Sequence, residues 1–362
     1  MLTLKDENLY YIGGVVRDEI LGLESFDTDL TYQGNAIEKF GDLPECIKIN
    51  EPFGTVRLSI DNKELDIAST RDEFYEKKGH LPTVINIGCN LEQDVKRRDF
   101  TINSLAKSTL TGEIIDYTGG LIDIKNKVLR VLHDKSFEDD PTRIIRGLKF
   151  AVRFGFNLDK KTKFLQEKYL QNINYDMSYK RVKKELIETF NLNSQKAFDE
   201  FFNQKIYKLL TTNEIIPPKY NIEKLVNNFP VDNIWMVYLG WMNLDKLPLT
   251  REEQKIIDDY NILKNTTIKN DDFMIYKTFF DKTKESILLY IITTNTDYGL
   301  RFFEIKDIKI SITGDDLKNL GINPSKKYSD CFDFVLKQKL ENPKISKSDE
   351  LKFAKDFFNL KD

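Results

Sequence analysis

The sequence has few of the residues that build zinc sites and disulfide frameworks. Its three cysteines, Cys46, Cys89 and Cys331, are far apart and form no Cys-x-x-Cys pair, and it has only two histidines. Zinc sites need grouped Cys or His ligands, and disulfide frameworks need several cysteines at close spacing. The composition therefore argues against both.

Long apolar runs are also missing. A membrane-spanning helix needs about 20 mostly apolar residues in a row, and no stretch approaches that pattern. The amino terminus, MLTLKDENLYYIGG, lacks the basic region and long apolar run of a secretory signal. We therefore expect a soluble, cytoplasmic protein with no membrane partner. The sequence does not indicate an oligomeric state.

The whole chain has little excess of one sign of charge, but one stretch of it has a clear excess. The net charge of the 362 residues is −3, which does not indicate a nucleic-acid binder. Between Arg143 and Lys184, however, twelve Lys or Arg stand against three acids, a local balance of +9. This stretch predicts a surface for a phosphate backbone, although an ordinary solvated helix face has the same composition.

The residues from Tyr11 to Gly34 predict a strand, a glycine turn, a short helix and a second strand. Gly13 and Gly14 allow backbone amides to approach a phosphate at a helix start. Asp27 and Asp29 alternate along the second strand and so share one face, where carboxylates can hold Mg²⁺. A glycine turn or an acidic strand edge is common alone. The combination suits metal-assisted nucleotidyl transfer.

Here the chain resembles the polymerase-β-like nucleotidyltransferases, and more closely the class II tRNA nucleotidyltransferases and bacterial poly(A) polymerases. Gly13 to Asp18 match the motif GGxVRD, and Asp27 to Asp29 match DxD. The resemblance implies an α+β fold, in which a polymerase-β-like head with a mixed β-sheet is followed by all-α neck, body and tail domains. We expect the head at residues 1–135, the neck at 136–190, the body at 191–300 and the tail at 301–362.

A second motif, RRDFTINS, runs from Arg97 to Ser104 and differs from the family's RRDFTINA only at its last residue. Paired arginines at Arg97 and Arg98 can neutralise a triphosphate, as can Arg17 in the first motif. Asp99 and Asn103 lie four residues apart, which predicts that they share a helix face and can bond a ribose hydroxyl.

A third stretch, Asp139 to Lys149, predicts a helix that begins at Pro141 with Asp140 as its N-cap. Asp140 accepts hydrogen bonds and Arg143 donates them, so the pair can select C or A by the Watson–Crick edge of the base. This stretch resembles the family's EDxxR motif, with Asp139 in place of Glu. Arg146 and Lys149 follow on the same helix side and can contact the triphosphate or base.

Two further segments bear on the catalytic head. The predicted strand Glu64 to Ala68 places Asp66 where this superfamily often has a third catalytic carboxylate, although a surface acid near a turn has the same pattern. The segment Thr70 to Pro82 shows no periodicity and predicts a loop. It resembles a family loop implicated in the switch from C to A addition, and its presence argues against an enzyme that adds only C.

Candidate RNA contacts lie in two places. Lys180, Arg181 and Lys183 belong to a stretch that resembles the family's fifth motif, and Lys326 and Lys327 follow a glycine turn in the tail. We expect the first group near the tRNA acceptor arm and the second at the tRNA elbow, where lysines bind phosphates without reading bases. A plain C-terminal helical hairpin explains the tail pattern equally well.

The resemblance therefore implies template-independent addition of CCA to the 3′ end of tRNA from CTP and ATP, with two Mg²⁺ ions held by Asp27 and Asp29. Three alternatives share most of the motifs. They are a tRNA enzyme that adds only the terminal A, a poly(A) polymerase, and an RNA-binding module that has lost its chemistry.

Overall fold

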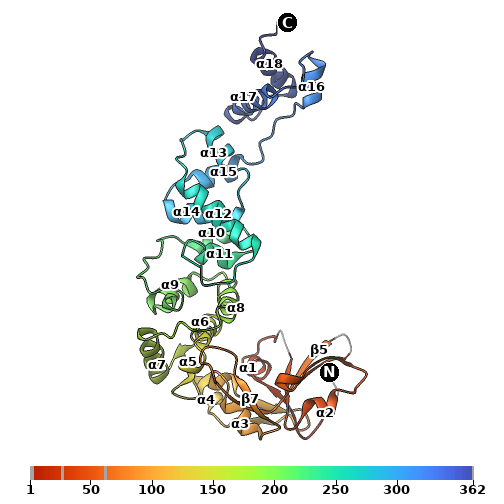
Figure 1. The fold of residues 1–362 in the computed structure, drawn as a ribbon, viewed down its shortest axis with the longest axis vertical. Helices are drawn as coiled ribbons and strands as arrows, with labels where there is room; N and C mark the ends of the chain where they lie inside the picture. The colour runs from red at the N-terminus through yellow and green to blue at the C-terminus, as the bar shows by residue number, and fades with distance from the viewer. Residues whose placement is uncertain (1–3, 26–27, 61–62, 361–362) are drawn as a thin grey trace. The chain divides into compact units, whose positions relative to one another are not determined.

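The computed structural model describes residues 4–25, 28–60 and 63–360. The chain forms two compact units. The first comprises the chain up to Ile215 together with Asp245–Pro248, and the second comprises Ile216–Leu244 and the chain from Leu249 onward. Figure 1 labels the elements along the chain, and each unit is described below by itself.

Within the described residues, the head of the first unit is built on a mixed sheet of seven strands in the order β3-β4-β5-β2-β1-β8-β9. The strands are β1 (Leu9–Ile12), β2 (Asp29–Tyr32), β3 (Cys46–Asn50), β4 (Thr55–Ile60), β5 (Lys63–Ser69), β8 (Ala106–Ser108) and β9 (Ile114–Ile115). Only β2 and β5 pair in parallel, and the other neighbours are antiparallel. The mixed sheet confirms the predicted head fold.

One face of this sheet carries a hydrophobic core. Side chains alternate along a strand, so Val56 and Leu58 on β4 and Leu65 and Ile67 on β5 all reach the same side and are buried. Helix α2 (Ala36–Phe40) covers this face with Phe40. The residues between the buried ones must therefore point to the opposite face, where the polar side chains of β2, β4 and β5 lie.

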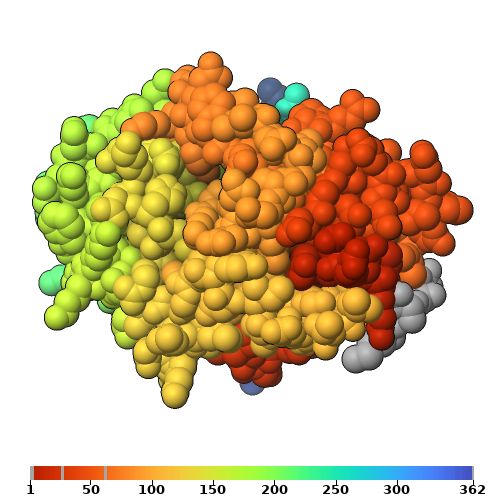
Figure 2. Space-filling view, turned by 90° about the horizontal axis from the view of Figure 1, so that it is seen from below, coloured from red at the N-terminus to blue at the C-terminus, as the bar shows by residue number. Residues whose placement is uncertain are grey.

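Helices surround the sheet and continue into the neck (Figure 1). The first unit contains α1 (Gly14–Ile20), α2, α3 (Leu91–Lys96), α4 (Gly120–Asn126), α5 (Ser136–Asp139), α6 (Thr142–Phe154), α7 (Lys160–Gln171), α8 (Tyr179–Phe190) and α9 (Gln195–Asn203), with the 3₁₀ turns η1 (Glu51–Phe53), η2 (Thr101–Asn103) and η3 (Ile206–Leu209) and the short parallel pair β10 (Val128–Leu129) and β11 (Asn157–Leu158). In the space-filling view, the red, orange and yellow residues of this unit form one continuous surface (Figure 2).

Helix α6 is the central element of the neck and packs against α8. Ile144, Ile145 and Leu148 on one of its sides are buried, as the apolar spacing predicted. The helix begins at Thr142, one residue later than predicted. The Asp140 carboxylate still accepts the Thr142 amide at 3.1 Å, so it stabilises the first turn as expected of a cap.

Two local predictions were wrong. Asp99 and Asn103 lie on the approach to and at the end of η2, a single 3₁₀ turn, and not on an α-helix. The segment predicted as a loop from Thr70 to Pro82 begins with strand β6 (Arg71–Phe74), which pairs with β7 (Thr83–Ile87) in an antiparallel hairpin. Pairing with a strand outside the segment supplied the backbone partners, which local periodicity does not reveal.

The second unit is helical throughout its described residues, as predicted for the body and tail. Its helices are α10 (Ile222–Asn228), α11 (Ile234–Leu239), α12 (Arg251–Asn265), α13 (Asp272–Phe279), α14 (Lys284–Thr294), α15 (Tyr298–Ile305), α16 (Gly314–Asn319), α17 (Lys327–Glu341) and α18 (Lys347–Phe357). Helix α14 is buried on nearly all sides, with α12, α11 and α15 against it. Every described helix in the chain is too short or too polar to cross a bilayer.

Candidate active site

The polar face of the head sheet brings two of the predicted catalytic carboxylates together. In the parallel pairing of β2 with β5, Asp29 stands directly opposite Asp66. Their neighbours Leu30 and Ile67 are buried in the core on the other face, so both carboxylates point away from that core. Asp29 and Asp66 both line a cavity of about 410 Å³ on this face. Asp27 lies outside the described residues.

Asp29 and Asp66 form a donor set that fits Mg²⁺, because adjacent exposed carboxylates supply the hard oxygen ligands this ion prefers. The guanidinium of Arg57 already binds Asp66 through two hydrogen bonds, of 2.7 and 2.8 Å. Asp66 is therefore already paired with a cation on this face, directly opposite Asp29. Among the described residues no group of three or more Asp, Glu, His or Cys gathers as a ready metal cluster.

The glycine turn of the first motif lies against the arginines of the second. Gly13 has a φ of 73°, a conformation that favours glycine, and a Cβ there would stand 3.3 Å from Nη1 of Arg98. Glycine thus lets the arginine approach the backbone. Nε of Arg98 is buried without a hydrogen-bond partner in the described part of the chain. Burial lowers the pKa of Arg98 against the pull of Asp94. An anionic ligand would supply what this guanidinium lacks.

A second cavity, of about 780 Å³, adjoins the first, because Asp29, Arg97 and Arg98 line both. All eleven predicted nucleotide-binding residues line this second cavity, which we call the neck cleft: Gly13, Gly14, Arg17, Arg97, Arg98, Asp99, Asn103, Asp140, Arg143, Arg146 and Lys149. The tertiary structure therefore brings together residues that are up to 136 positions apart in the sequence (Gly13 and Lys149).

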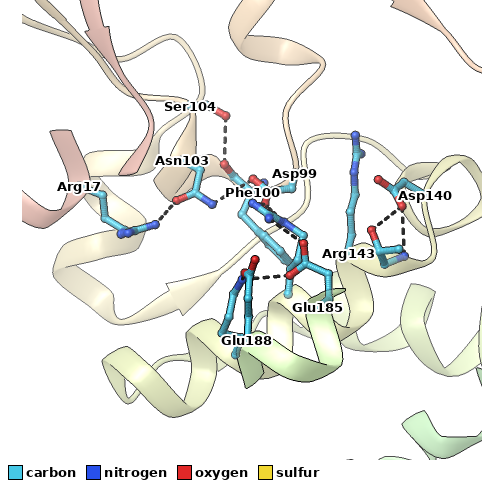
Figure 3. A network of polar contacts seen from close by, with 12 residues as sticks. Arg17, Asp99, Phe100, Asn103, Ser104, Asp140, Arg143, Glu185 and Glu188 are labelled. Carbon is cyan, nitrogen blue, oxygen red and sulfur yellow. Dashed lines mark hydrogen bonds and ion pairs between the residues drawn. The ribbon is translucent and has the colours of Figure 1, made fainter. Parts of the chain in front are cut away.

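A hydrogen-bonded chain connects the head to the neck across this cleft (Figure 3). Arg17 donates to Oδ1 of Asn103, whose Nδ2 donates to Asp99 at 3.0 Å. Asp99 in turn accepts Nε of Arg146 at 2.7 Å. Asp99 and Asn103 are thus side by side, as their predicted role at a ribose hydroxyl requires. Arg17 is only 4% exposed and stacks on Phe154, so it supports Asn103 from beneath.

Ion pairing keeps the carboxyl group of Asp99 deprotonated. Burial opposes its charge, but the cations of Arg146 and Arg143 and the bond from Asn103 prevail and lower the pKa of Asp99 to about 2. In the same way, burial opposes the charge of Arg146, and the carboxylates of Asp99 and Glu185 more than offset it and raise the pKa of Arg146. Both side chains are therefore charged at neutral pH.

The predicted base-reading pair lies at the other end of the cleft. Oδ1 of Asp140 is bound by the amide and hydroxyl of Thr142, and Oδ2 is bound by Arg181. Arg143 donates to Ser136 Oγ at 2.7 Å and to the backbone oxygen of Arg97 at 3.0 Å. Both side chains are at most 5% exposed and are fixed in orientation. Asp140 precedes α6 and Arg143 lies in its first turn, so an acceptor and a donor stand three residues apart at the start of this helix.

The segment that follows β6 contacts Arg143 and also Arg181, the residue that binds Asp140. Tyr75 places its hydroxyl 3.3 Å from Arg143, and the backbone oxygen of His80 accepts Arg181 at 3.1 Å. The backbone amide of Gly79 also donates to the Asp139 oxygen, and the Gly79 oxygen accepts the Ser178 amide, both at 2.9 Å. The segment that the family resemblance connects with C-to-A switching therefore docks on the residues proposed to read the base.

The predicted RNA contacts lie in different surroundings. Lys180 is exposed at the start of α8, whereas Lys183 is buried and donates to the backbone oxygen of Pro248 at 2.9 Å. Arg181 lies in the neck cleft, bound to Asp140. In the second unit, Lys326 and Lys327 are exposed at the start of α17. The sequence reasoning placed these residues on RNA, and that assignment stays a prediction.

Several cleft residues were not proposed from the sequence. They are Glu73 and Tyr75 in and after β6, Arg153 on α6, and Glu185 and Glu188 on α8. In the sequence, Arg153 continues the side of the helix that carries Arg146 and Lys149, and Glu185 follows Arg181 by one turn, so a signal for both was present. Arg181 also lines the cleft. In total, eight Lys or Arg and six Asp or Glu line it, which is a formal excess of two positive charges.

Comparison with known proteins shows which family this chain is similar to. Residues 9–130 match the model of the poly A polymerase head domain. An A-adding tRNA nucleotidyltransferase of Halalkalibacterium halodurans is 29% identical over 98% of this chain and 90% of that protein. Another, of Geobacter sulfurreducens, is 29% identical over 96% of this chain, which spans 44% of that longer protein.

A solved structure extends the likeness to the fold. The Thermotoga maritima CCA-adding enzyme complexed with tRNA superposes with a TM-score of 0.74 at 25% identity, over 96% of this chain and 90% of that one. The head domain, the relatives and the shared fold confirm the likeness that the motifs indicated, which is to the class II tRNA nucleotidyltransferases and bacterial poly(A) polymerases.

Proposed function

We propose that this enzyme extends the 3′ end of tRNA without a nucleic-acid template, using CTP and ATP to complete the sequence CCA. The observation that carries the proposal is the neck cleft itself. Along one continuous cavity it places a carboxylate at the start of β2, arginines beside a glycine turn, a proposed ribose-binding pair and an acceptor–donor pair. These four features match the metal, phosphate, sugar and base of a nucleoside triphosphate.

The phosphates lie near the head in this proposal. Gly13 and Gly14 keep the backbone low enough for a phosphate to approach, and the unpaired Nε of Arg98 marks a place for an anion. The excess of cations around the cleft attracts the triphosphate. The ribose then reaches Asp99 and Asn103, which distinguish a ribonucleotide through its hydroxyl groups.

The base lies between Asp140 and Arg143. Cytosine and adenine both carry an amino group that donates to the Asp140 carboxylate and a ring nitrogen that accepts from Arg143. Uracil and guanine present an oxygen where the amino group must be, and two acceptors then face each other. The carboxylate is held in place by Thr142 and Arg181, so that it does not rotate to accommodate the wrong base.

Catalysis takes place on the polar face of the head sheet, beside β2 and β5. Asp27 and Asp29, with Asp66 opposite Asp29, are the residues that would hold two Mg²⁺ ions, which would supply charge neutralisation at the phosphates and lower the pKa of the attacking hydroxyl. The RNA 3′ oxygen forms a bond to the α-phosphorus while the bond from that phosphorus to the bridging oxygen breaks and pyrophosphate leaves. With the triphosphate in the neck cleft, the RNA end approaches Asp29 from the adjoining cavity on the sheet face.

The tRNA is held by its phosphates in this proposal. The basic stretch of the neck, including exposed Lys180, lies near the acceptor arm, and Lys326 and Lys327 contact the elbow. Since such binding releases counterions, the affinity for tRNA decreases steeply as salt is raised. Bases are not read by these contacts.

Addition of the terminal A alone is a second candidate. It is favoured by the Halalkalibacterium and Geobacter relatives, which are both A-adding and align over nearly the whole of this chain. CCA addition is favoured by the likeness to the Thermotoga CCA-adding structure, and the Thr70–Pro82 segment argues only against an enzyme that adds C alone. Addition of A to a tRNA that ends in CC is common to both.

Nucleotide incorporation separates these functions. Labelled CTP and ATP, singly and together with Mg²⁺, are supplied to a tRNA ending at the discriminator base and to one ending in CC. Three nucleotides on the first substrate support CCA addition, and one A added only to the second supports the A-only enzyme. A long tail of A indicates a poly(A) polymerase. No incorporation together with tight, salt-sensitive tRNA binding indicates an RNA-binding module and overturns both proposals.

A further inference from the structure

Glu185 on α8 ends the polar chain that crosses the neck cleft. Its side chain is 10% exposed and accepts two cations from α6, Arg146 at 3.1 Å and Lys149 at 2.9 Å. Figure 3 shows its carboxylate turned toward the Asp99 side of the site. No predicted contact with base, sugar or phosphate uses this residue. Glu185 is thus a buried charged group within the site whose role is unassigned.

Arg146 is held from two sides. Its Nε and Nη2 both lie 2.7 Å from Oδ2 of Asp99, and its Nη1 binds Glu185. A guanidinium is planar and its donors are fixed in direction, so two carboxylates on different edges determine its position. If either carboxylate loses its charge, Arg146 turns fully to the other.

Asp99 has no free acceptor position while Arg146 is bound to it. Its Oδ1 accepts the Phe100 amide at 2.8 Å and Nδ2 of Asn103 at 3.0 Å, and its Oδ2 accepts Nε of Arg146 and forms an ion pair with Nη2 of the same guanidinium at 2.7 Å. A carboxylate offers about four lone-pair positions, and these four nitrogens surround them. A ribose hydroxyl can donate to Asp99 only if one of these donors leaves.

Arg146 is the donor that can leave. The Phe100 amide belongs to the backbone, and Asn103 is held by buried Arg17. The side chain of Arg146 is 31% exposed and already has a second anionic partner in Glu185. Moving from Asp99 to Glu185 keeps its charge paired, which avoids the cost of a buried unpaired ion.

We propose, on the basis of the function proposed above, that Glu185 is a positioning residue for ribonucleotide selection: it receives Arg146 so that the ribose 2′-hydroxyl can take its place on Asp99. Glu185 touches neither the nucleotide nor the RNA. It acts by making the exchange on Asp99 inexpensive. Without its charge, Arg146 stays on Asp99 and the hydroxyl loses its acceptor.

A purely structural role for Glu185 makes a different prediction. If it only joins α6 to α8, its loss reduces stability and weakens ATP and 2′-deoxy-ATP alike. If it positions Arg146 for the exchange, its loss weakens ATP selectively, because 2′-deoxy-ATP never uses the contact. The ratio of the two affinities therefore separates the two roles.

The test compares Glu185→Gln with the unaltered chain. Dissociation constants for ATP and 2′-deoxy-ATP are measured by calorimetry, and kcat/KM is measured for each with tRNA ending in CC. We expect the preference for ATP to fall about tenfold, with most of the change in KM for ATP. Glu185→Asp, which keeps the charge, should restore part of the preference and serves as the test variant if Glu185→Gln does not fold.

Glu188→Gln is the matched control. Glu188 lies one turn farther along α8 and binds Lys149 but not Arg146. Its loss should leave the ratio of ATP to 2′-deoxy-ATP as it is in the unaltered chain. An unchanged ratio in Glu185→Gln, or an equal loss for both nucleotides, overturns the inference while ATP addition by the unaltered chain still stands. No preference for ATP in the unaltered chain also overturns it. If the unaltered chain binds ATP but adds nothing to tRNA, the proposed function fails and the binding ratio still decides the role of Glu185.

Discussion

Charged side chains are buried in both units, and the two arrangements are different. In the first unit, Asp99, Arg146, Glu185 and Lys149 share partners in an extended network beside a cavity. In the second unit, Glu350 on α18 is fully buried and binds a single cation, Lys339 on α17.

The remaining contacts of Glu350 complete the difference. Its Oε2 accepts the amides of Ser311 and Ile312 at 2.6 and 2.9 Å, and the apolar side chains of the tail cluster, among them Cys331 and Val335, pack nearby. Every partner of this carboxylate comes from the tail itself. In the neck cleft, by contrast, cations outnumber carboxylates and Nε of Arg98 has no partner in the described chain. A buried carboxylate whose partners all come from the fold has a structural role, whereas a charged network that includes a donor without a partner leaves a place for a ligand.

The largest effect that the comparison predicts is on catalysis. Asp29→Asn should lower kcat for ATP addition by about 10³-fold or more, equal to about 4 kcal/mol, because the carboxylate charge that holds the metal is lost. Asp29 is exposed at the strand edge, so the midpoint of urea unfolding should stay close to that of the unaltered chain. A kcat within tenfold of the unaltered chain would refute the metal assignment.

The next effect is on stability in the second unit. Glu350→Ala leaves Lys339 buried without its counter-charge and two amides without an acceptor, so unfolding of this unit should become about 3–5 kcal/mol easier. Urea unfolding followed by circular dichroism measures it. Lys318→Ala, which removes an exposed pair with Asp315, is the control and should cause no measurable loss. Equal effects of the two variants would mean that the buried pair is not a structural anchor.

A smaller effect concerns pH and the first unit. The pKa of Asp99 is lowered from 3.8 to about 2 in the fold, a difference of about 2 kcal/mol. A depressed carboxyl pKa contributes stability above the unfolded value, and this contribution is lost as pH falls through the folded value. Stability should therefore decline between about pH 4 and pH 2. Asp99→Asn should be less stable at pH 7 and should show a shallower decline over this range in urea titrations at each pH. The same slope in both chains would contradict the charge pairing.

The smallest effect concerns selection of the base. Arg181 joins the Asp140 carboxylate to the backbone oxygen of His80. Arg181→Lys keeps the charge but cannot make both contacts in one plane, so the carboxylate should be less well oriented. We expect kcat/KM for ATP to fall about fivefold and incorporation of UTP to rise relative to ATP, equal to about 1 kcal/mol of discrimination. If UTP remains excluded as in the unaltered chain, Arg181 does not orient Asp140.

Much of the site was predictable because its motifs are local. Gly13 and Arg98, which the motifs assigned separately to phosphates, lie against each other, and Asp99 lies beside Asn103 even though the segment is a 3₁₀ turn. The hairpin from β6 was missed because its hydrogen-bond partner is β7, beyond the segment that was considered. Asp27 is outside the described residues, so its predicted role stays a prediction.

The sequence by itself determined the elements and the residue types of the site. Alternation along β4 and β5 in the sequence matches the side chains that enter the core, and the glycine, arginine and carboxylate motifs indicated the chemistry. Only the tertiary structure decided which charges pair. Arg146 and Glu185 are 39 residues apart, and Arg181 and His80 are 101 apart, so no local period connects them. Long-range packing brings α6, α8 and the β6–β7 segment together, and the free energy of burying charges then determines which of them must pair.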